Sequence, residues 1–376
     1  MSVPEAAATP WIDRRDALEA WLAHLPADAA LGVDTEFMRR NTFHPQLALL
    51  QLGWSGRYAL VDPLAFDIAD TLRARVAEGP MVTVMHSAGE DLEALAPLLP
   101  QGPATLFDTQ IAAAFVGMGL GLSYRALVAE LVGVELDKGE TRSDWLQRPL
   151  TESQRLYATL DVVYLEPVHA QLAARLAERG RTAWHAEDCE RLKRRADVHE
   201  GDPQPQRGFR AAADWSRARQ ALLRRILLWR DRSARTLDRP RSWLLEDALA
   251  LSLVQDLPRS LAEFEQRSRG QRALRSAQRA ELFELLARTP DADELAATAP
   301  IPASMPGPAK KALAAMKEAV DRLAGELDLP PGLLCPRKVL EEYLTTGEWP
   351  EFLEGWRRGV LHERLSTLLP DATVAM

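Results

Sequence analysis

The chain has only two cysteines in 376 residues, Cys189 and Cys335, and they lie far apart in the sequence. Such a pair excludes a disulfide framework and a zinc cluster, and it favours a reducing compartment, so we expect a cytoplasmic protein. No apolar run reaches the roughly 18 residues that a membrane span needs. The N-terminal stretch also lacks the basic start and apolar core of a signal peptide. We therefore expect no membrane association.

Lysine is absent from residues 207–290, which hold 18 arginines against 10 acidic residues and so carry a net charge of +8. Residues 1–206 carry −11 and residues 291–376 carry −5. This uneven distribution indicates separate modules. Arginine forks suit phosphate groups, so the middle block is a candidate for binding nucleic acid. The alternative is a solvated helical face in which arginine replaces lysine.

Strand-like runs bounded by turn residues occur at 30–38, 46–54, 57–62, 81–86 and 105–109. Helices are expected at 13–24, 67–78, from near Ser87 or Gly89, at 109–116 and at 124–132, the last capped by Ser123. Three consecutive strands followed by alternating strands and helices predict a mixed α/β sheet flanked by helices. Residues 151–180 read as one long helix that Thr151 caps, Gly180 ends and Pro167 kinks.

The rest of the chain shows only helical periodicity. Residues 181–212 have the composition of a linker, and a proline-rich segment at 299–310 separates two small bundles. Helices are expected at 213–235, 242–257, 259–268, 271–287, 310–326, 336–346, 350–355 and 357–368. We therefore expect domains at 1–206, with a core at about 30–180 followed by the linker, at 207–292 and at 293–376.

The strand LGVDTEFM carries two carboxylates, Asp34 and Glu36, inside its apolar run. Residues two apart in a strand lie on the same face, so the two side chains are neighbours. Buried like charges repel and need protons or a cation, and hard oxygen ligands favour Mg²⁺ or Mn²⁺ over zinc. A polar strand face that meets water is the alternative for this pair alone.

Two further carboxylates follow along the chain. Asp91, in HSAGED, opens a helix directly after strand 81–86, where a negative charge is favourable in any case. Tyr157 and Asp161 in YATLD are four apart and share one helix face, and Asp161 interrupts an apolar stretch. Four carboxylates with a tyrosine one turn away can hold a pair of divalent metal ions, Mg²⁺ or Mn²⁺. Such a pair supports in-line displacement at phosphorus.

The motifs D-T-E-F, H-x-A-G-E-D and Y-x-x-x-D, in this order, resemble the DEDDy class of 3′→5′ exonucleases, whose fold is ribonuclease H-like. Residues 136–165, LDKGETRSDWLQRPLTESQRLYATLDVVYL, and HPQLALLQL at 44–52 are similar to bacterial ribonuclease D. The similarity extends to 213–290 as an HRDC-type helical domain, and weakly to the C-terminal block as a second, divergent HRDC-like bundle.

The resemblance implies a role for each core residue. Asp34 bridges both metals, Glu36 and Asp161 complete the site of the metal that activates water, and Asp91 supports the second metal. Tyr157 hydrogen-bonds the attacking water, because a tyrosine that titrates near 10 orients water rather than ionising. One small departure is Phe43, where the family often has tyrosine.

Several residues are weaker candidates for substrate contact. His86 either touches phosphate or holds its turn, Phe37 either stacks on the terminal nucleotide or belongs to the core, and Arg142 and Trp145 either line a channel or pack. In the arginine-rich block the candidates for backbone phosphate are Arg232, Arg235, Arg239 and Arg241.

The expected activity is that of a 3′→5′ exoribonuclease that releases nucleoside 5′-monophosphates and acts as a monomer. The resemblance implies tRNA precursors and other RNAs with 3′ extensions as substrates. Three alternatives stay open: a repair-type DNA exonuclease with the same site, a non-catalytic RNA-binding scaffold, and a protein-interaction module built on the HRDC part.

Overall fold

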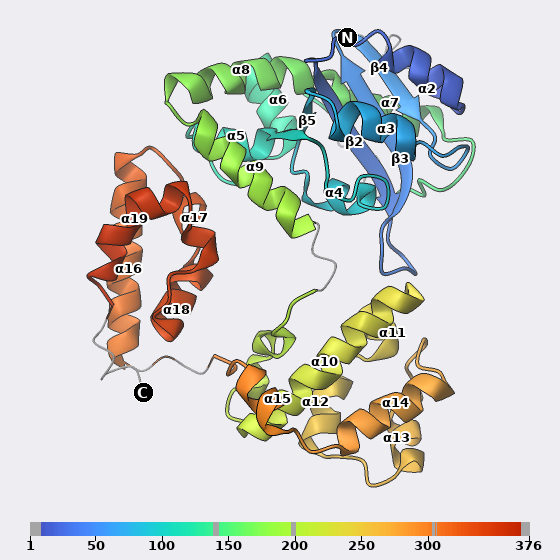
Figure 1. Cartoon of the computed structure of the whole chain (residues 1–376). Helices are drawn as coiled ribbons and strands as arrows, with labels where there is room; N and C mark the ends of the chain where they lie inside the picture. Colours follow the sequence, from blue (N-terminus) through green and yellow to red (C-terminus); the bar gives the residue numbers. More distant parts are fainter. Residues whose placement is uncertain (1–8, 138–142, 197–200, 303–304, 306, 370–376) are drawn as a thin grey trace. The chain divides into compact units, whose positions relative to one another are not determined.

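The computed structural model describes residues 9–137, 143–196, 201–302, 305 and 307–369 (Figure 1). The chain divides into two compact units. One unit contains the described residues up to 38, those between 46 and 196 and those from 307 on. The other contains residues 39–45 and the described residues between 201 and 305. None of the described helices combines the length and the apolar character needed to cross a bilayer.

The first unit is built on a six-stranded mixed sheet of order β1-β4-β3-β2-β5-β6. Its strands are β1 (Trp11–Ile12), β2 (Ala30–Met38), β3 (Gln46–Trp54), β4 (Arg57–Val61), β5 (Val82–Met85) and β6 (Thr105–Asp108). β2, β3 and β4 are antiparallel neighbours, whereas β5 and β6 run parallel to β2 and β1 runs parallel to β4. The five strands expected from the sequence are confirmed. β1 was missed because two residues show no periodicity.

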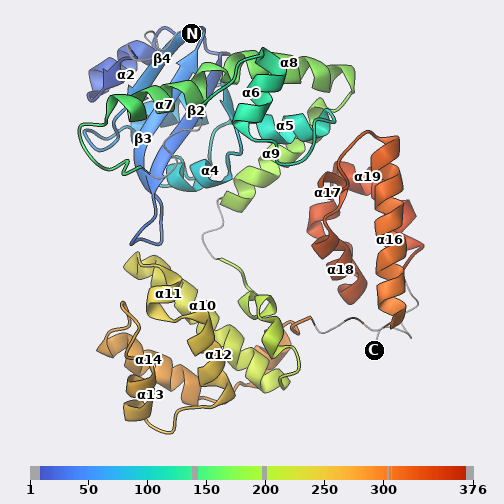
Figure 2. The same cartoon turned by 180° about the vertical axis from the view of Figure 1, so that it is seen from behind.

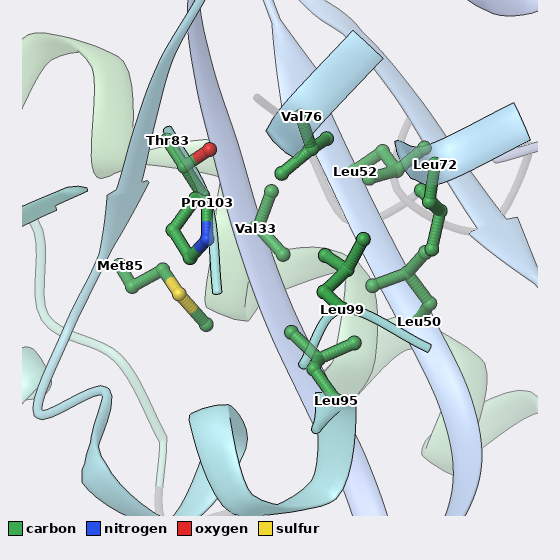
Figure 3. A pocket seen from close by; sticks show the side chains of 10 residues that line it. All are labelled: Val33, Leu50, Leu52, Leu72, Val76, Thr83, Met85, Leu95, Leu99 and Pro103. Carbon is green, nitrogen blue, oxygen red and sulfur yellow. The ribbon is translucent and has the colours of Figure 1, made fainter. Parts of the chain in front are cut away.

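One face of the sheet packs under helices α2 (Arg15–Leu22), α3 (Ala69–Leu72), which continues as a π-helical turn (Arg73–Ala77), and α4 (Gly89–Leu95). Alternate residues of β2 and β3, among them Val33, Leu50 and Leu52, point into this apolar core. The core contains a small cavity, lined by those three residues together with Leu95, Leu99 and others (Figure 3). The cavity lies on the face opposite to the side chain of Asp34, so it is part of the core packing.

The other face of the sheet is crossed by α7 (Glu152–Val163), which lies in front of the sheet in Figure 2. Two glycines, Gly32 on β2 and Gly53 on β3, are cross-strand partners under the end of this helix. A Cβ atom on Gly53 would lie 2.9 Å from the carbonyl oxygen of Val162, and one on Gly32 would lie 3.2 Å from Cβ of Leu165. The glycine pair therefore allows the helix to approach the strands closely.

The long helix expected at 151–180 is wrong, because the chain forms two helices, α7 and α8 (Leu165–Glu178), that meet at Tyr164. The break is not at Pro167, which lies in the first turn of α8, where a missing N–H group costs little. The expected cap is confirmed, since Thr151 and Gln154 form a capping box. Helices α5 (Thr109–Phe115) and α6 (Tyr124–Val132) precede them, and Ser123 caps α6 as expected.

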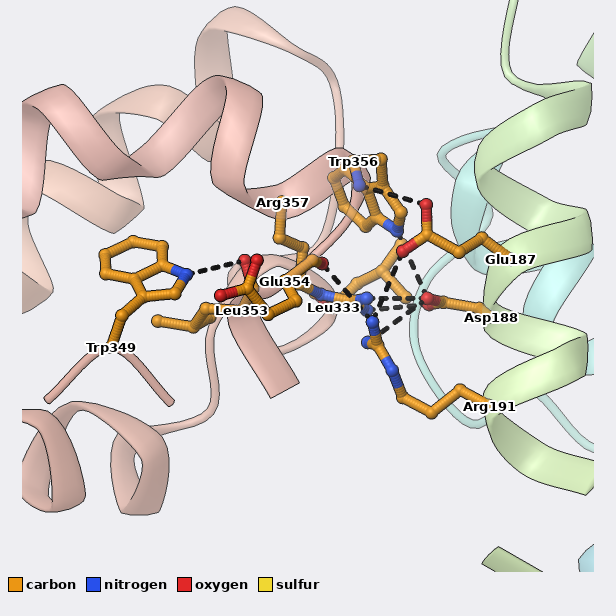
Figure 4. A network of polar contacts seen from close by, with 9 residues as sticks. All are labelled: Glu187, Asp188, Arg191, Leu333, Trp349, Leu353, Glu354, Trp356 and Arg357. Carbon is orange, nitrogen blue, oxygen red and sulfur yellow. Dashed lines mark hydrogen bonds and ion pairs between the residues drawn. The ribbon is translucent and has the colours of Figure 1, made fainter. Parts of the chain in front are cut away.

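The linker expected at 181–212 is also wrong in its first half, where α9 (Thr182–Ala196) forms. The buried face of α9 carries His185, Asp188 and Cys189 instead of aliphatic residues, so the helix shows little apolar periodicity in the sequence. Asp188 forms a buried ion pair with Arg357 (Figure 4). This contact joins α9 to the C-terminal elements α16 (Gly307–Glu326), α17 (Pro331–Leu334), α18 (Arg337–Thr346), a 3₁₀ turn (Glu351–Leu353) and α19 (Trp356–Ser366).

The second unit is helical around a core that includes Trp229. Its elements are two 3₁₀ turns (Pro205–Gly208 and Arg210–Ala212), α10 (Arg217–Leu237), α11 (Arg241–Leu244), α12 (Asp247–Gln255), α13 (Leu261–Arg267), α14 (Ser276–Ala287) and α15 (Ala292–Ala297). The helix expected at 242–257 is divided by extended backbone at Leu245 and Glu246. The helix expected at 350–355 is only a 3₁₀ turn.

Candidate active site

Asp34 and Glu36 lie on the face of β2 that α7 covers. Their cross-strand partners on β3 are Gln51 and Leu49, and Leu49 packs in the apolar cluster beneath α7. A β-bulge follows Glu36, where Ala48 of β3 has no partner on β2. In this register both carboxylates lie on the same face of β2, as their spacing predicted.

Asp161 reaches the same place from the last turn of α7. One carboxylate oxygen from each of Asp34, Glu36 and Asp161 lies within 4.8 Å of the others, and all three side chains are half-buried. Tyr157, one turn earlier on α7, donates a hydrogen bond to Asp161. The helix thus brings its tyrosine and its carboxylate together over β2.

Asp91 approaches from the opposite layer. β2 is paired with β5 only as far as Gly32 and Val84, so Asp34 and Glu36 lie on the part of β2 that continues past this pairing. Helix α4 begins there, and the hydroxyl of Thr35 donates a hydrogen bond of 2.5 Å to Oδ1 of Asp91. Thr35 was not identified from the sequence, because a threonine inside a strand is the ordinary residue for that position.

Mutual repulsion and burial shift the acidity of all four groups. Burial raises the pKa of Glu36 to about 9 and that of Asp161 to about 8, with neighbouring carboxylates adding to both shifts. Burial raises the pKa of Asp91 to about 6, although its hydrogen bond from Thr35 acts in the opposite direction. Asp34 has a pKa well above its usual range because of burial and then of the charges of Asp91, Asp161 and Glu36.

This donor set fits divalent cations. Asp34, Glu36 and Asp161, placed this close together, would hold protons near neutral pH unless positive charge neutralises them. They are hard oxygen donors, with no cysteine or histidine among the three that cluster most closely, and this is the ligand chemistry of Mg²⁺ and Mn²⁺.

The weaker candidates near the carboxylates have different surroundings. Nδ1 of His86 lies 2.9 Å from the Thr109 hydroxyl, its ring lies against Tyr124, and burial lowers its pKa. Trp145 is 3% exposed and its ring centre is 6.1 Å from that of Tyr157, so it packs against the tyrosine. Phe37 is half-buried at the end of β2, and Arg142 lies outside the described residues.

Two of the arginine candidates in the second unit already form ion pairs within the protein. Arg235 and Arg241 both pair with Asp231, and both guanidinium groups lie over the ring of Phe43, at 4.7 and 4.6 Å from its centre. Arg232, in contrast, is exposed on α10.

The loop that carries Phe43 is also held by its backbone. Asp238, which ends α10 in the left-handed conformation, accepts hydrogen bonds from the N–H groups of Phe43 and His44. Arg239 contacts the carbonyl of Asn41. This contact could not be predicted from the sequence, because the partners are almost 200 residues apart.

Gln51 was also missed. It is fully buried opposite Asp34, and neither atom of its amide has a hydrogen-bond partner within the described residues. Only the register of β2 against β3 places it beside the carboxylates, and a sequence read strand by strand does not give that register.

Comparison with known proteins agrees with this arrangement. A family model described as 3′-5′ exonuclease matches residues 9–177. Ribonuclease D of Xanthomonas oryzae is 40% identical over 345 residues, which are 91% of this chain and 93% of that protein. Ribonuclease D of Escherichia coli is 31% identical over 368 residues, 95% of this chain and 97% of that protein.

A solved structure of the Escherichia coli enzyme, described as an exoribonuclease involved in structured RNA processing, superposes with a TM-score of 0.80. It is 29% identical and covers 96% of this chain and 98% of its own. The mixed sheet, its helices and the matching family model define a 3′→5′ exonuclease. The chain belongs to the ribonuclease D family. It is a metal-dependent 3′→5′ exoribonuclease, so the resemblance identified in the sequence is confirmed.

Proposed function

We propose that this exoribonuclease removes nucleotides one at a time from the 3′ ends of tRNA precursors and other 3′-extended RNAs, and releases nucleoside 5′-monophosphates. We propose further that Asp34, Glu36, Asp91 and Asp161 hold two divalent cations, Mg²⁺ or Mn²⁺. The observation that supports this most directly is that one carboxylate oxygen from each of Asp34, Glu36 and Asp161 lies within 4.8 Å of the others. Asp91 is hydrogen-bonded to Thr35, which lies between Asp34 and Glu36 on β2.

Each carboxylate has a distinct part in this proposal. The charge of Asp34 interacts with those of the other three carboxylates, so it is the residue to be shared by both cations. Glu36 and Asp161 would hold one cation, and Asp91 would support the other. Bound divalent cations lower the pKa of water and neutralise the attacking and leaving oxygens of an in-line displacement.

Tyr157 is assigned to orient the attacking water. Burial and the charges of Asp161, Glu36 and Asp34 raise the pKa of its hydroxyl, so the group stays protonated at neutral pH. A protonated hydroxyl can accept one hydrogen bond while donating another to Asp161, which suits orientation of water and rules out proton abstraction. Trp145 packs against the ring and restricts its movement.

The helical regions are assigned to RNA binding. We propose HRDC-type bundles at 207–292 and 293–376 after an exonuclease domain at 1–206. Arg232 is the preferred phosphate contact among the four candidates, because Arg235 and Arg241 already pair with Asp231. His86, Phe37, Arg142 and Trp145 are secondary candidates, of which Trp145 is too buried to meet substrate without movement.

We also propose that the protein acts as a monomer in the cytoplasm. Both cysteines are buried and unpaired, which suits a reducing compartment. Sedimentation at micromolar concentration tests the monomer.

Matched substrates test the proposed chemistry. A tRNA precursor with a 3′ extension, a single-stranded RNA and a DNA of the same sequence are digested with Mg²⁺ and, separately, with Mn²⁺. We expect loss of the RNA 3′ extensions with mononucleotides as products. Faster cleavage of the DNA would instead identify a repair-type nuclease, and binding of RNA without cleavage under either metal would identify a scaffold.

A further inference from the structure

The break between α7 and α8 contains a side chain from a third helix. The hydroxyl of Tyr124, the first residue of α6, accepts a hydrogen bond of 3.1 Å from the N–H of Tyr164. The same hydroxyl donates a hydrogen bond of 3.4 Å to the carbonyl oxygen of Leu160. In a continuous α-helix the N–H of Tyr164 would bond that same carbonyl directly. The hydroxyl therefore stands in place of one helical hydrogen bond, and insertion of this kind is a recognised cause of helix bends.

The bend lies immediately after the catalytic turn of α7. Leu160, whose carbonyl oxygen accepts the hydrogen bond from Tyr124, directly precedes Asp161. The residues just beyond it rest on the glycine pair of the sheet, with Val162 over Gly53 and Leu165 over Gly32. These strand positions are two residues from Asp34 and its partner Gln51. The path of the backbone at this bend thus fixes where Asp161 stands relative to β2.

Tyr124 is suited to a permanent structural bond at this place. It is deeply buried, and its pKa is raised by that burial and then by the charge of Asp161, with Asp34 contributing further. The hydroxyl keeps its proton at all physiological pH values and so remains a donor to Leu160 while it accepts from Tyr164.

We propose that Tyr124 is a positioning residue for the exonuclease reaction: its hydroxyl holds the bend between α7 and α8 and thereby sets Asp161 in place to bind a cation with Asp34 and Glu36. This inference rests on the proposed function, in which Asp161 is a metal ligand. Without the hydroxyl, Tyr164 can bond Leu160 directly, the helix straightens, and the last turn of α7 shifts on the sheet.

The substitution Tyr124→Phe removes this hydroxyl and nothing else. Mg²⁺ binding is measured by titration calorimetry, and kcat and KM for a single-stranded RNA are measured at limiting and at saturating Mg²⁺. We expect Mg²⁺ affinity to fall by about tenfold or more, as for other residues that orient metal ligands. We expect kcat to fall at limiting Mg²⁺ and to recover in part at high Mg²⁺, whereas KM for RNA stays within about twofold.

Tyr343→Phe is the matched control, because Tyr343 is a buried tyrosine on α18, far along the chain from the carboxylates. An unchanged Mg²⁺ affinity and kcat in Tyr124→Phe would overturn the inference, as would an equal loss in Tyr343→Phe. A lower melting temperature with parental Mg²⁺ affinity would also overturn it, because the role would then be structural only.

Two further variants keep the test decisive. If Tyr124→Phe does not fold, Gly53→Ala disturbs the same bend from the sheet side, since its Cβ would meet the carbonyl oxygen of Val162 at 2.9 Å. Parental Mg²⁺ affinity in folded Gly53→Ala then contradicts the inference. Asp161→Asn is measured in parallel. If Asp161→Asn keeps parental Mg²⁺ affinity, the proposed metal site is wrong. If Asp161→Asn loses Mg²⁺ affinity and Tyr124→Phe does not, the proposed metal site stands and the role of Tyr124 is wrong.

Discussion

The hydroxyl of Thr35 donates a hydrogen bond of 2.5 Å to Oδ1 of Asp91, and it thereby joins the strand that carries two carboxylates to the helix that carries another. Thr35 points to the face opposite to Asp34 and Glu36, so β2 carries the two carboxylates proposed to bind metal on one side and donates a hydrogen bond to Asp91 on the other. This bond lowers the pKa of Asp91 and favours the ionised form that a cation requires.

Thr35→Val keeps the shape of the side chain and removes this bond. We expect the pKa of Asp91 to rise further and Mg²⁺ affinity to fall by about tenfold, measured by titration calorimetry. Thr83→Val on β5 is the matched control, because the Thr83 hydroxyl is buried without a hydrogen-bond partner in the described part of the chain. Its removal should leave stability equal or higher. Equal Mg²⁺ affinity in both variants would contradict the role of Thr35.

The acidity of the site gives the metal-free protein a characteristic pH dependence. Glu36 and Asp161 have folded-state pKa values of about 9 and about 8, raised from roughly 4 in the unfolded chain. For acids with raised pKa values, the contribution to stability is complete below about pH 4 and is lost as pH rises through the folded-state values. With a chelator, we therefore expect the free energy of unfolding to fall from pH 5 to pH 9.

If divalent cations bind these carboxylates as proposed, they replace the protons there, so the same unfolding series with saturating Mg²⁺ should show a smaller fall. The apparent Mg²⁺ affinity should rise over the same interval, because binding releases protons. Urea unfolding at each pH, with and without Mg²⁺, measures both effects. Parallel pH profiles in the two series would show that these carboxylates are not where the cations bind.

The ion pair that joins α9 to the C-terminal helices should be important for stability. Arg357 forms two hydrogen bonds of 2.6 Å with Asp188, and their side chains are 1% and 8% exposed. Arg357→Met leaves a buried carboxylate without its main partner and should cost about 3–5 kcal/mol in urea unfolding.

Arg364→Met removes an exposed arginine that pairs with Glu326 in the same region, and it should cost at most about 1 kcal/mol. Equal losses in the two arginine variants would show that burial does not distinguish these ion pairs.

The strands of this protein were predicted from the sequence more completely than its helices. Period-two alternation located β2 and the side of it that carries Asp34 and Glu36, because that signal lies within the strand itself. The break at Tyr164 could not be predicted, since the hydroxyl that occupies it comes from Tyr124, 40 residues earlier. α9 was missed for a related reason: its buried Asp188 has its partner 169 residues later.

RNA affinity should depend on the arginines of α10 that the chain leaves exposed. Arg232→Gln should weaken RNA binding for all sequences alike and reduce the salt dependence of binding by about one phosphate contact. Fluorescence anisotropy with a labelled RNA, at several salt concentrations and with a chelator to prevent cleavage, measures the slope. Arg14→Gln, an exposed arginine just before α2 and outside the helical regions, is the control. A parental slope in Arg232→Gln would place the RNA contacts elsewhere.

The most direct test digests a single-stranded RNA labelled at its 5′ end, and separately at its 3′ end, with Mg²⁺ or with a chelator. We expect the 5′-labelled RNA to shorten stepwise and the 3′-labelled RNA to yield labelled mononucleotide at once, only with Mg²⁺. Asp34→Asn should slow both by at least about 100-fold while RNA binding persists, whereas exposed Asp28→Asn should match the parent. Parental cleavage by Asp34→Asn, or stepwise shortening of the 3′-labelled RNA from its 5′ end, would contradict the assignment of this site.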